Sequence, residues 1–289
     1  LKELDPHSQY LTREEMEQFR ARINGKFAGV GIRYLIHNDT LVVRSIIPNS
    51  PASKAGIMPN DRITEVDNRS IIGIDIDSVV KLLRGDAGSN LSLSIVRRGK
   101  ANTLTINIKR ADIESSAISA SYRIGDVGYI GISSFSKPMP NEFYQAYKTL
   151  GDIKSLVIDL RDNGGGAITS AIDLSSMFLT KGDLIVSTEG KTHNESHHKR
   201  QDRISLTIPL VVVINESSAS ASEIFAGAVQ DHDRGVIIGR TSYGKGLVQR
   251  VIDLKDGSGM SITIARYKTP SGRIIQRPYQ MGEGDKYRS

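Results

Sequence analysis

The sequence predicts a small β-rich module followed by a larger α/β module. The length of 289 residues is sufficient for two domains with separate hydrophobic cores. Short strand patterns dominate residues 27–110, whereas longer helical patterns alternate with apolar strand patterns after residue 112. Because strands that alternate with helices are typical of α/β folds, we expect a largely parallel sheet in the second module.

The first module is predicted from alternating or continuous apolar runs separated by turn residues. A polar segment, residues 1–25, precedes it and contains a helix start at Thr12-Arg-Glu-Glu15. One amphipathic helix is expected over residues 76–84, and Gly85 ends it. The expected strands are 31–36, 41–47, 62–66, 91–96 and 104–108.

The second module is predicted from apolar runs that alternate with segments of helical periodicity. Buried strands are expected at 127–132, 155–160, 210–214 and 235–239. Helices are expected at 141–150, 168–179 and 218–230, where apolar residues recur every three or four positions. A further strand is expected at 247–254. These elements support an α/β core that extends from residue 112 to residue 289.

The composition excludes several classes of function. There is no cysteine, which excludes disulfides, thiol catalysis and thiolate metal sites. No segment approaches the ~18 consecutive apolar residues that a membrane-spanning helix needs. The net charge of +6 arises from 38 basic and 32 acidic residues spread along the chain, so it does not predict a nucleic-acid partner.

Two glycines precede the first strand of the β-rich module, in Gly29-Val30-Gly31-Ile32. Glycines allow successive amide N–H groups to turn toward one small concavity, which suits an anion such as a carboxylate. Taken alone, the two glycines are better explained by a β-bulge than by an anion site.

Two stretches in the α/β module combine a buried strand with small residues. One runs from Asp159 into three successive glycines, whose amides are suited to a phosphate or a developing oxyanion, or which simply form a tight turn. The other is 215–223, where Ser218 or Ser220 opens the next helix. For a single serine in that position, capping of the helix is the more frequent role. The three glycines are Gly164, Gly165 and Gly166.

The stretch from Gly239 to Lys245 matches the first seven positions of a phosphate-binding loop, G-x-x-x-x-G-K. A true loop of this kind has a Ser or Thr hydroxyl at the eighth position and leads into a helix. Here Gly246 follows the lysine, and the next segment has a strand pattern. The nucleotide-binding interpretation therefore fails, and Lys245 needs another role.

Histidine is a poor candidate for a general base. If Ser220 and His232 belong to one helix, twelve residues separate them by ~18 Å, whereas proton transfer needs roughly 3 Å. His193, His197 and His198 fall in a polar run that is expected to be a solvated loop rather than a metal site. A Ser–Lys pair remains, which is a variant of the serine–base arrangement.

Four stretches of the second module resemble the carboxyl-terminal processing proteases (tail-specific proteases, peptidase family S41). The stretches are 159–166, 218–223, 244–249 and 269–273, and Leu4-Asp-Pro-His-Ser8 adds to the likeness. Residues 26–111 resemble a PDZ domain, through 29–32, 50–56 and 60–63. The resemblance implies an α/β core related to the crotonase and Clp protease folds, joined to a β-rich PDZ domain, with 1–25 packing on the core.

The resemblance implies a role for each matching residue. Ser220 would be the nucleophile, Lys245 the general base and Gln249 the residue that orients the lysine. The amides of Ala221 and one of Gly164 to Gly166 would form the oxyanion hole, and Asp231 would give support from ~16 Å along the helix. In the PDZ domain, the terminal carboxylate of a peptide would be held by the loop of Gly29, Val30, Gly31 and Ile32.

The lysine role is consistent with its chemistry. Free lysine has a pKa of about 10.4 and acts as a base near neutral pH only when burial or cationic neighbours lower that pKa. A carboxamide such as that of Gln249 accepts a hydrogen bond from the lysine without adding charge. On a straight strand Lys245 and Gln249 would stand ~13 Å apart, so contact between them requires a bend.

Further expectations concern partners and location. The resemblance implies protein substrates recognised by their C-termini, no cofactor and no metal, a homo-oligomer, and an extracytoplasmic location in or facing the periplasm. Any membrane association would depend on segments outside this sequence. Because residues 109–112 join the two modules without a flexible linker, Arg84 at the end of the PDZ helix is a candidate for coupling them.

Two other functions compete with proteolysis. One is a non-catalytic PDZ scaffold whose second module is a degenerate enzyme, against which the intact Ser220, Lys245 and Gln249 argue. The other is a crotonase-like acyl-transfer enzyme whose glycine-rich amides hold a thioester. The second alternative leaves the peptide-binding module without a purpose.

Overall fold

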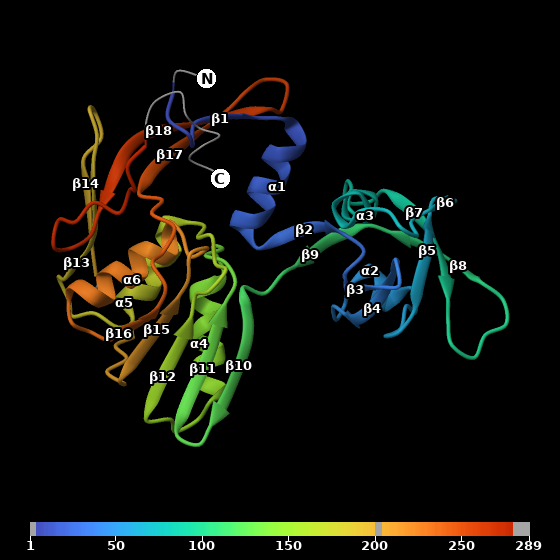
Figure 1. Cartoon of the computed structure of the whole chain (residues 1–289), viewed down its shortest axis with the longest axis horizontal. Helices are drawn as coiled ribbons and strands as arrows, with labels where there is room; N and C mark the ends of the chain where they lie inside the picture. The colour runs from blue at the N-terminus through green and yellow to red at the C-terminus, as the bar shows by residue number, and fades with distance from the viewer. Residues whose placement is uncertain (1–3, 200–203, 280–289) are drawn as a thin grey trace. The chain divides into compact units, whose positions relative to one another are not determined.

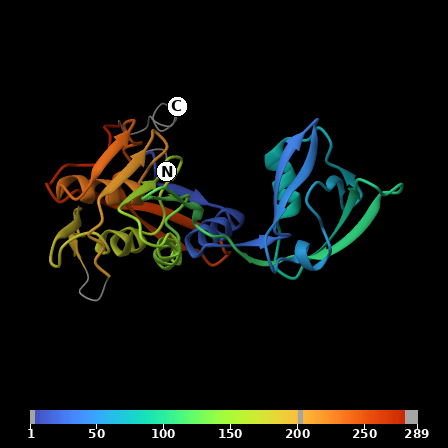
Figure 2. The same ribbon diagram turned by 90° about the horizontal axis from the view of Figure 1, so that it is seen from below.

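The computed structural model describes residues 4–199 and 204–279 and divides the chain into two compact units (Figures 1 and 2). One unit combines Leu1–Gly25 with Ser116–Ser289, and the other is Lys26–Ser115. The N-terminal segment therefore belongs to the α/β unit, although the β-rich unit separates the two in sequence.

A five-stranded sheet forms the centre of the α/β unit. Its strand order is β10-β11-β12-β15-β16, with β10 antiparallel and the other four parallel to one another. The predicted largely parallel sheet is therefore confirmed. The strands are β10 Ile118–Ile124, β11 Val127–Ile132, β12 Ser155–Asp159, β15 Leu210–Ile214 and β16 Val236–Gly239.

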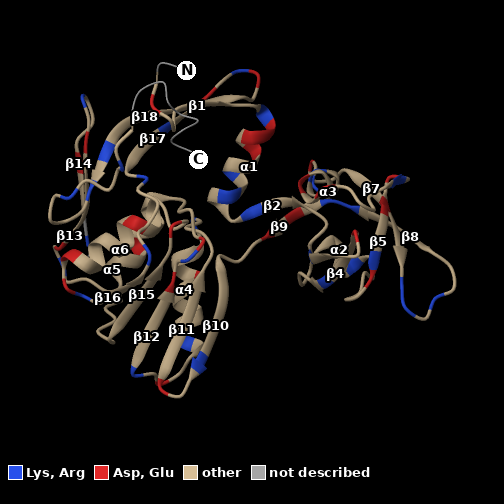
Figure 3. Cartoon of the chain, in the orientation of Figure 1, with Lys and Arg blue, Asp and Glu red and all other residues tan. Residues whose placement is uncertain are grey.

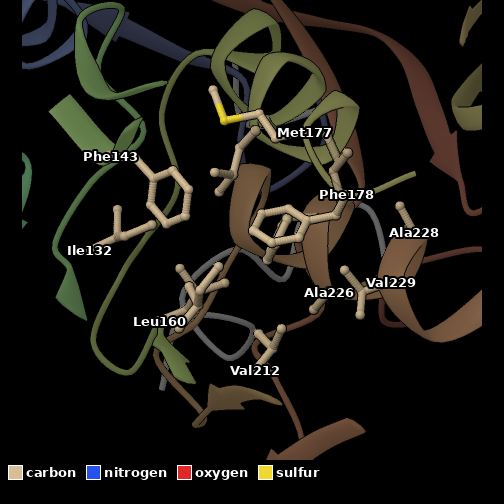
Figure 4. Close-up of a cluster of buried hydrophobic side chains, with 14 of the residues drawn as sticks. Ile132, Phe143, Leu160, Met177, Phe178, Val212, Ala226, Ala228 and Val229 are labelled. Atoms are coloured by element: carbon tan, nitrogen blue, oxygen red, sulfur yellow. The ribbon is translucent and has the colours of Figure 1, made fainter. Parts of the chain in front are cut away.

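The hydrophobic core of this unit lies between the sheet and three helices (Figure 1). The helices are α4 Met139–Thr149, α5 Ile168–Ser176 and α6 Ala221–Asp231. Ile158 and Val212 of the sheet are fully buried in this core. Phe178, which follows α5, lies edge-on to two other rings, at 5.9 Å from Phe143 of α4 and 6.0 Å from Phe225 of α6. Phe143 and Phe178 are labelled in Figure 4. Aromatic pairs in this geometry add to the stabilisation from burial alone, so these contacts help to hold α4 and α6 against the segment after α5.

A second sheet in this unit contains strands that are far apart in the chain. Its strands are β1 Gln9–Leu11, β13 Leu184–Glu189, β14 Glu195–His198, β17 Leu247–Asp253 and β18 Gly259–Lys268. The predicted strand at 247–254 is confirmed, whereas the ten-residue β18 was not anticipated. β18 pairs with both β1 and β17, which attaches the N-terminal segment to the region after Lys245.

Helix α1, Arg13–Asn24, begins where the sequence predicts it. The amide of Glu15 donates to Thr12 Oγ1 at 3.2 Å, and the amide of Thr12 donates to Glu15 Oε2 at 2.8 Å. This reciprocal capping box satisfies amides that have no partner inside the helix. The helix buries Met16 and is capped by Gly25, whose φ of 66° is a conformation that glycine adopts without strain.

The β-rich unit contains the strands and the helix predicted for it. Its main sheet has the order β3-β4-β5-β7-β8, with β3 at one edge and β6 paired to β5, and a separate pair is formed by β2 and β9. The elements are β2 Lys26–Gly29, β3 Ile32–His37, β4 Thr40–Ile46, α2 Pro51–Lys54, β5 Arg62–Val66, β6 Arg69–Ser70, α3 Ile76–Leu83, β7 Asn90–Val96, β8 Leu104–Lys109 and β9 Ala111–Glu114.

Two local expectations were wrong. Helix α6 begins at Ala221 rather than at Ser218, because the backbone turns sharply at Ser220 and Ser218 is buried ahead of the helix. The polar run expected to be a solvated loop contains β14, Glu195–His198, which pairs with β13. Polar composition does not prevent a strand when a neighbouring strand satisfies its backbone groups.

Charges of both signs are spread over both units, without concentration of the positive excess on one element (Figure 3). In the ranges 4–199 and 204–279, no helix combines the length and apolar character required to span a bilayer. The same described residues contain no cluster of three His, Asp or Glu side chains that suits a metal ion. His193 and His197 each lie 3.5 Å from Glu195 Oε2 instead.

Candidate active site

Three neighbouring parallel strands lead into the three stretches that were singled out in the sequence. β12 precedes the loop with the three glycines, β15 precedes Ser220, and β16 precedes the loop with Lys245. These strands are adjacent in the sheet and run in the same direction, so the loops after them meet at its carboxyl edge. Ligand sites of open α/β sheets lie at that edge.

Ser220 has a strained backbone, with φ 57° and ψ −111°, between β15 and α6. Among the described residues, every other non-glycine residue with positive φ is Asn or Asp, which tolerate this region better. Strain of this kind costs about 1–3 kcal/mol and is concentrated at functional sites. Ser220 is thereby distinguished from an ordinary helix-capping serine, whose backbone is extended.

The neighbouring serines have structural roles or none. Ser218 is fully buried, and its hydroxyl donates to the carbonyl of Leu160 at 2.7 Å. Ser222 is also fully buried, and its hydroxyl donates to the carbonyl of Asn163 at 2.8 Å. Ser217 is exposed. Only Ser220 combines partial exposure with a strained backbone.

The glycine-rich loop packs directly against the Ser220 turn. A Cβ atom on Gly165 would lie 2.6 Å from the carbonyl oxygen of Ala219 and 2.9 Å from Ser220 Cβ. The amide of Ala219 donates to the carbonyl of Asn163 at 3.0 Å. Glycine is therefore required at position 165 both by its φ of 93° and by the closeness of the two loops.

Some backbone amides near Ser220 already donate a hydrogen bond within the protein, and others do not. The amide of Gly165 donates to Asn163 Oδ1 at 2.9 Å and is not available to a ligand in this conformation. The N–H groups of Ala221, Gly164 and Gly166 donate to no group in the described part of the chain. The oxyanion hole remains a prediction. In this conformation its candidate donors are the amides of Ala221, Gly164 and Gly166, while Gly165 permits the close packing of the two loops.

Glu223 joins the Ser220 turn to the Lys245 loop, a role that the sequence did not reveal. Its Oε2 accepts from the amides of Ser220 at 2.7 Å and Lys245 at 2.9 Å. Its Oε1 accepts from the amide of Gly244 at 2.6 Å and the hydroxyl of Ser242 at 2.8 Å. A single buried carboxylate thus holds the backbones of both residues proposed for chemistry.

Lys245 is half-buried, and its environment favours the neutral amine. Burial lowers the pKa of Lys245 below its ordinary value of 10.5, and the positive charge of Arg22 lowers it further. The carboxylates of Asp5 and Glu223 act in the opposite direction. The net lowering of the pKa is the change that a lysine needs to act as a general base.

Gln249 is placed at a bulge between Val248 and Gln249 in the pairing of β17 with β18. Its amide nitrogen donates to the carbonyl oxygen of His7. The structure does not show a hydrogen bond between Gln249 and Lys245 in the described residues, so the orienting role of Gln249 remains a prediction.

Asp231 lies at the far end of α6 from Ser220, as expected. Its Oδ2 accepts from the amide of Ser271 at 2.9 Å and from the hydroxyl of Ser271 at 2.6 Å, and its Oδ1 accepts from Arg273. The segment that follows is attached to the Lys245 loop, since the amide of Gly246 donates to Gln276 Oε1 at 3.0 Å. Asp231 is therefore connected to the lysine loop through the 269–277 segment, and its supporting role remains a prediction.

We expect Glu223→Gln to lower kcat by on the order of 10²-fold while KM changes little. Loss of the carboxylate would let Ser220 and Lys245 move relative to each other, and a displacement of about 1 Å between reacting groups costs a rate factor of this size. The amide nitrogen of glutamine would face backbone donors that now bind a carboxylate oxygen. Glu216→Gln, an exposed change seven residues earlier, is the matched control. Equal kcat in the two variants, measured by steady-state kinetics, would show that Glu223 is not required.

Asp231→Asn is expected to lower the free energy of unfolding by about 2 kcal/mol at neutral pH. Burial raises the pKa of Asp231, but hydrogen bonds from Ser271, Thr269 and Arg273 outweigh it and lower the pKa to about 2. A lowered folded-state pKa stabilises the protein above the unfolded pKa of about 3.8, and this stabilisation disappears as pH falls toward 2. Urea unfolding of both proteins at pH 7 and near pH 2 measures the difference, which should be much smaller at the lower pH.

The β-rich unit offers features that suit an extended peptide. The N–H groups of Val30 and Gly31 donate to no group in the described ranges, and Gly31 has a φ of 85°. β3 forms the edge of its sheet and begins at Ile32, directly after these amides, while Gly29 ends β2. An unpaired strand edge next to free amides is the arrangement by which a peptide is bound through strand addition.

Arg84 follows helix α3 and has a partner inside the β-rich unit. Its guanidinium lies 5.8 Å from the centre of the Phe27 ring, at the distance of a cation–π interaction. Its amide donates to the carbonyl of Val80, which closes the helix end. The proposed coupling of the two modules by Arg84 remains a prediction.

Sequence reasoning also missed a buried acidic group beside the glycine-rich loop. Asp159 Oδ2 accepts from Nε and Nη2 of Arg161 at 2.9 and 2.6 Å and from the Tyr129 hydroxyl at 2.6 Å. Fully buried Asn163 donates to the carbonyl of Ile132 at 2.8 Å.

One sequence signal could have indicated Glu223. The pattern Ser220-x-x-Glu223 has the spacing of a capping box, in which the acidic side chain accepts from the backbone amide of the serine.

A strained serine between a strand and a helix, next to unengaged amides, is typical of α/β enzymes that use a serine nucleophile. The sequence profile of peptidase family S41 matches residues 126–280, and a PDZ domain profile matches residues 42–97. The first match spans more than half of the chain. The chain therefore belongs to peptidase family S41 and also contains a PDZ domain.

Two relatives agree with this assignment. The chain is 39% identical over 282 residues to a carboxy-terminal-processing protease of Bartonella bacilliformis, with 94% of this chain and 64% of the relative covered. It is 34% identical over 275 residues to the carboxy-terminal processing protease CtpA of Bacillus subtilis, with 94% and 59% covered. The chain thus spans about three-fifths of the length of these relatives.

Solved structures confirm the predicted fold class. The photosystem II D1 C-terminal processing protease matches 94% of this chain and 75% of its own, with a TM-score of 0.54 and 30% identity. A putative S41 protease from Bacteroides fragilis matches 97% and 81%, with a TM-score of 0.60. At 16% identity the second match concerns the fold alone.

Proposed function

We propose that the protein is a serine endopeptidase that uses Ser220 as nucleophile and Lys245 as general base, and that recognises protein C-termini through its PDZ domain. The observation that carries the proposal is the joint placement of a strained serine and a lysine of lowered pKa on loops held by one carboxylate, Glu223. Membership of family S41 supports the same reaction class.

The chemistry follows from the roles of these groups. Neutral Lys245 takes the proton from the Ser220 hydroxyl as its oxygen attacks the substrate carbonyl, and later gives a proton to the leaving amine. The unengaged amides of Ala221 and of Gly164 or Gly166 stabilise the negative charge on the tetrahedral intermediate. The chemistry is completed by hydrolysis of the acyl-enzyme, for which the same lysine activates water.

Substrate recognition is assigned to the edge of β3. The free amides of Val30 and Gly31 suit the terminal carboxylate, and the peptide main chain pairs with β3. Burial raises the pKa of Tyr34 on β3, and the nearby charges of Arg84 and Asp77 also act on it, so α3 flanks this edge. The PDZ domain thus recognises the substrate by its terminal carboxylate.

The experiment that tests the function compares one unfolded substrate with a free or an amidated C-terminus. Wild type should cleave the free acid faster, and the fragments should be identified by mass spectrometry. Lys245→Ala should cleave neither substrate. Reaction of wild-type Ser220 with a fluorophosphonate, without cleavage of either substrate, would favour a PDZ scaffold that retains only a reactive serine.

The expected location outside the cytoplasm and the expected homo-oligomer belong to the same proposal. Fractionation of cells that produce the full-length protein tests the first, and sedimentation of the purified protein tests the second.

A further inference from the structure

Residues 5–8 form a turn that is stabilised by hydrogen bonds to the carboxylate of its first residue, Asp5. Asp5 is only 8% exposed, and its Oδ1 accepts from the amides of His7 at 2.9 Å and Ser8 at 3.2 Å. Its Oδ2 accepts from the Ser8 hydroxyl at 2.5 Å. Three hydrogen bonds from adjacent residues hold the main chain of this turn in one conformation.

The same turn is fastened to the sheet that carries Gln249. The amide of Thr263 on β18 donates to Ser8 Oγ at 3.1 Å, which continues the pairing of β1 with β18 beyond Gln9. Thr263 is the β18 partner of Gln249 in the register of β17 with β18. The turn is therefore attached at the level of Gln249, on the opposite side of β18.

The contact with Gln249 determines which way its carboxamide points. The amide nitrogen of Gln249 donates to the carbonyl oxygen of His7. A carbonyl oxygen only accepts, so the reversed orientation would place two acceptors against each other. The turn thus engages the nitrogen of Gln249 and leaves the carboxamide oxygen as its remaining acceptor.

The N-terminal segment also supplies two opposite charges that act on Lys245. The Asp5 carboxylate favours the ammonium form, and Arg22 of α1 favours the neutral amine. Glu223 is the third charged group that acts on the lysine, and it favours the ammonium form. Residues far from Lys245 in sequence therefore contribute to its protonation.

We propose that the turn of residues 5–8 is a positioning part of the active site, which orients the Gln249 carboxamide through the His7 carbonyl and places the Asp5 charge near Lys245. This inference rests on the proposed function in assigning Lys245 as the base. Asp5 and Ser8 act through Gln249 and Lys245 and do not touch the substrate.

The first test removes the attachment of the turn. Ser8→Ala loses the hydroxyl that bridges Asp5 and Thr263, and we expect kcat to fall about tenfold with little change in KM. Ser8→Thr keeps a hydroxyl and should restore most of the rate. Ser196→Ala, an exposed change on β14 of the same sheet, is the control and should match wild type. A wild-type kcat in Ser8→Ala would overturn the positioning role.

The second test measures the protonation of the lysine without relying on activity. In Ser220→Ala protein with ¹³C-labelled lysine, the Cε resonance that disappears in Lys245→Ala is followed as a function of pH. Asp5→Asn removes a charge that stabilises the ammonium, so the titration should move to lower pH. Arg22→Gln removes a charge that opposes the ammonium, so the titration should move to higher pH. Asp152→Asn, which is exposed, should leave it unchanged.

The two tests separate failure of this inference from failure of the proposed function. If Asp5→Asn and Arg22→Gln shift the lysine titration in opposite directions but wild type cleaves no protein, the proteolytic function is wrong and the influence of the segment on Lys245 stands. If wild type is active but Asp5→Asn does not shift the titration, the turn has no influence on the lysine and the inference is wrong, whatever Arg22→Gln does.

Discussion

Ser220→Ala is expected to reduce proteolysis by on the order of 10⁴-fold or more, because removal of a nucleophile leaves only the contribution of binding and of the oxyanion hole. The fold should be retained, since alanine meets the same backbone strain at φ 57° as serine does. Initial rates on an unfolded substrate and thermal unfolding of the two proteins measure both effects.

Ser217→Ala is the matched control for this prediction. Ser217 is exposed and three residues away, whereas the hydroxyls of Ser218 and Ser222 are buried and bonded to backbone carbonyls. Comparable rates for Ser217→Ala and Ser220→Ala would end the assignment. Ser220→Gly should be as inactive as the alanine variant but more stable by about 1 kcal/mol, because glycine relieves the strain at positive φ.

Lys245→Ala should lower kcat by ~10²–10⁴-fold, the range that general-base catalysis contributes. Lys245→Arg should fail as well, because a guanidinium stays protonated at any usable pH. Measurement of kcat for both variants under saturating substrate tests this expectation. Substantial activity in Lys245→Arg would contradict a base at this position.

The pH profile provides an independent test of Lys245. Burial lowers the lysine pKa below 10.5, and only the neutral amine accepts a proton, so kcat/KM should rise with pH through that lowered value. His232→Gln should leave this acid limb in place. His232 follows α6, at the opposite end of the helix from Ser220. Its Nε2 forms a hydrogen bond with the carbonyl oxygen of Leu184 at 2.7 Å. An acid limb that disappears in His232→Gln would assign the base to histidine.

The sequence predicted the elements that bear the candidate residues but not all of their contacts. The strand after Lys245 was recognised from the pattern of its residues. A strand rather than a helix at this point, together with Gly246 in place of Ser or Thr, excluded a nucleotide-binding loop. Ser220 and Lys245 were selected by resemblance and by elimination of histidine. Glu223, which connects them, lies in the stretch 218–223 but was given no role. Its spacing from Ser220 is that of a capping box, whereas its contacts with Ser242, Gly244 and Lys245 depend on the folding of a distant loop against the helix.

The sequence by itself determined the two modules, the largely parallel character of the sheet in the second module and the approximate places of the loops, because these depend on the local periodicity of apolar residues. Only the tertiary structure decided that Gly165 serves close packing, that Ser220 has positive φ, and that the turn of residues 5–8 reaches Gln249. Residues more than 200 positions apart are brought together when β18 pairs on one side with β1 and on the other with β17. Such pairing depends on the burial of whole sheets, and no local segment of the sequence encodes it.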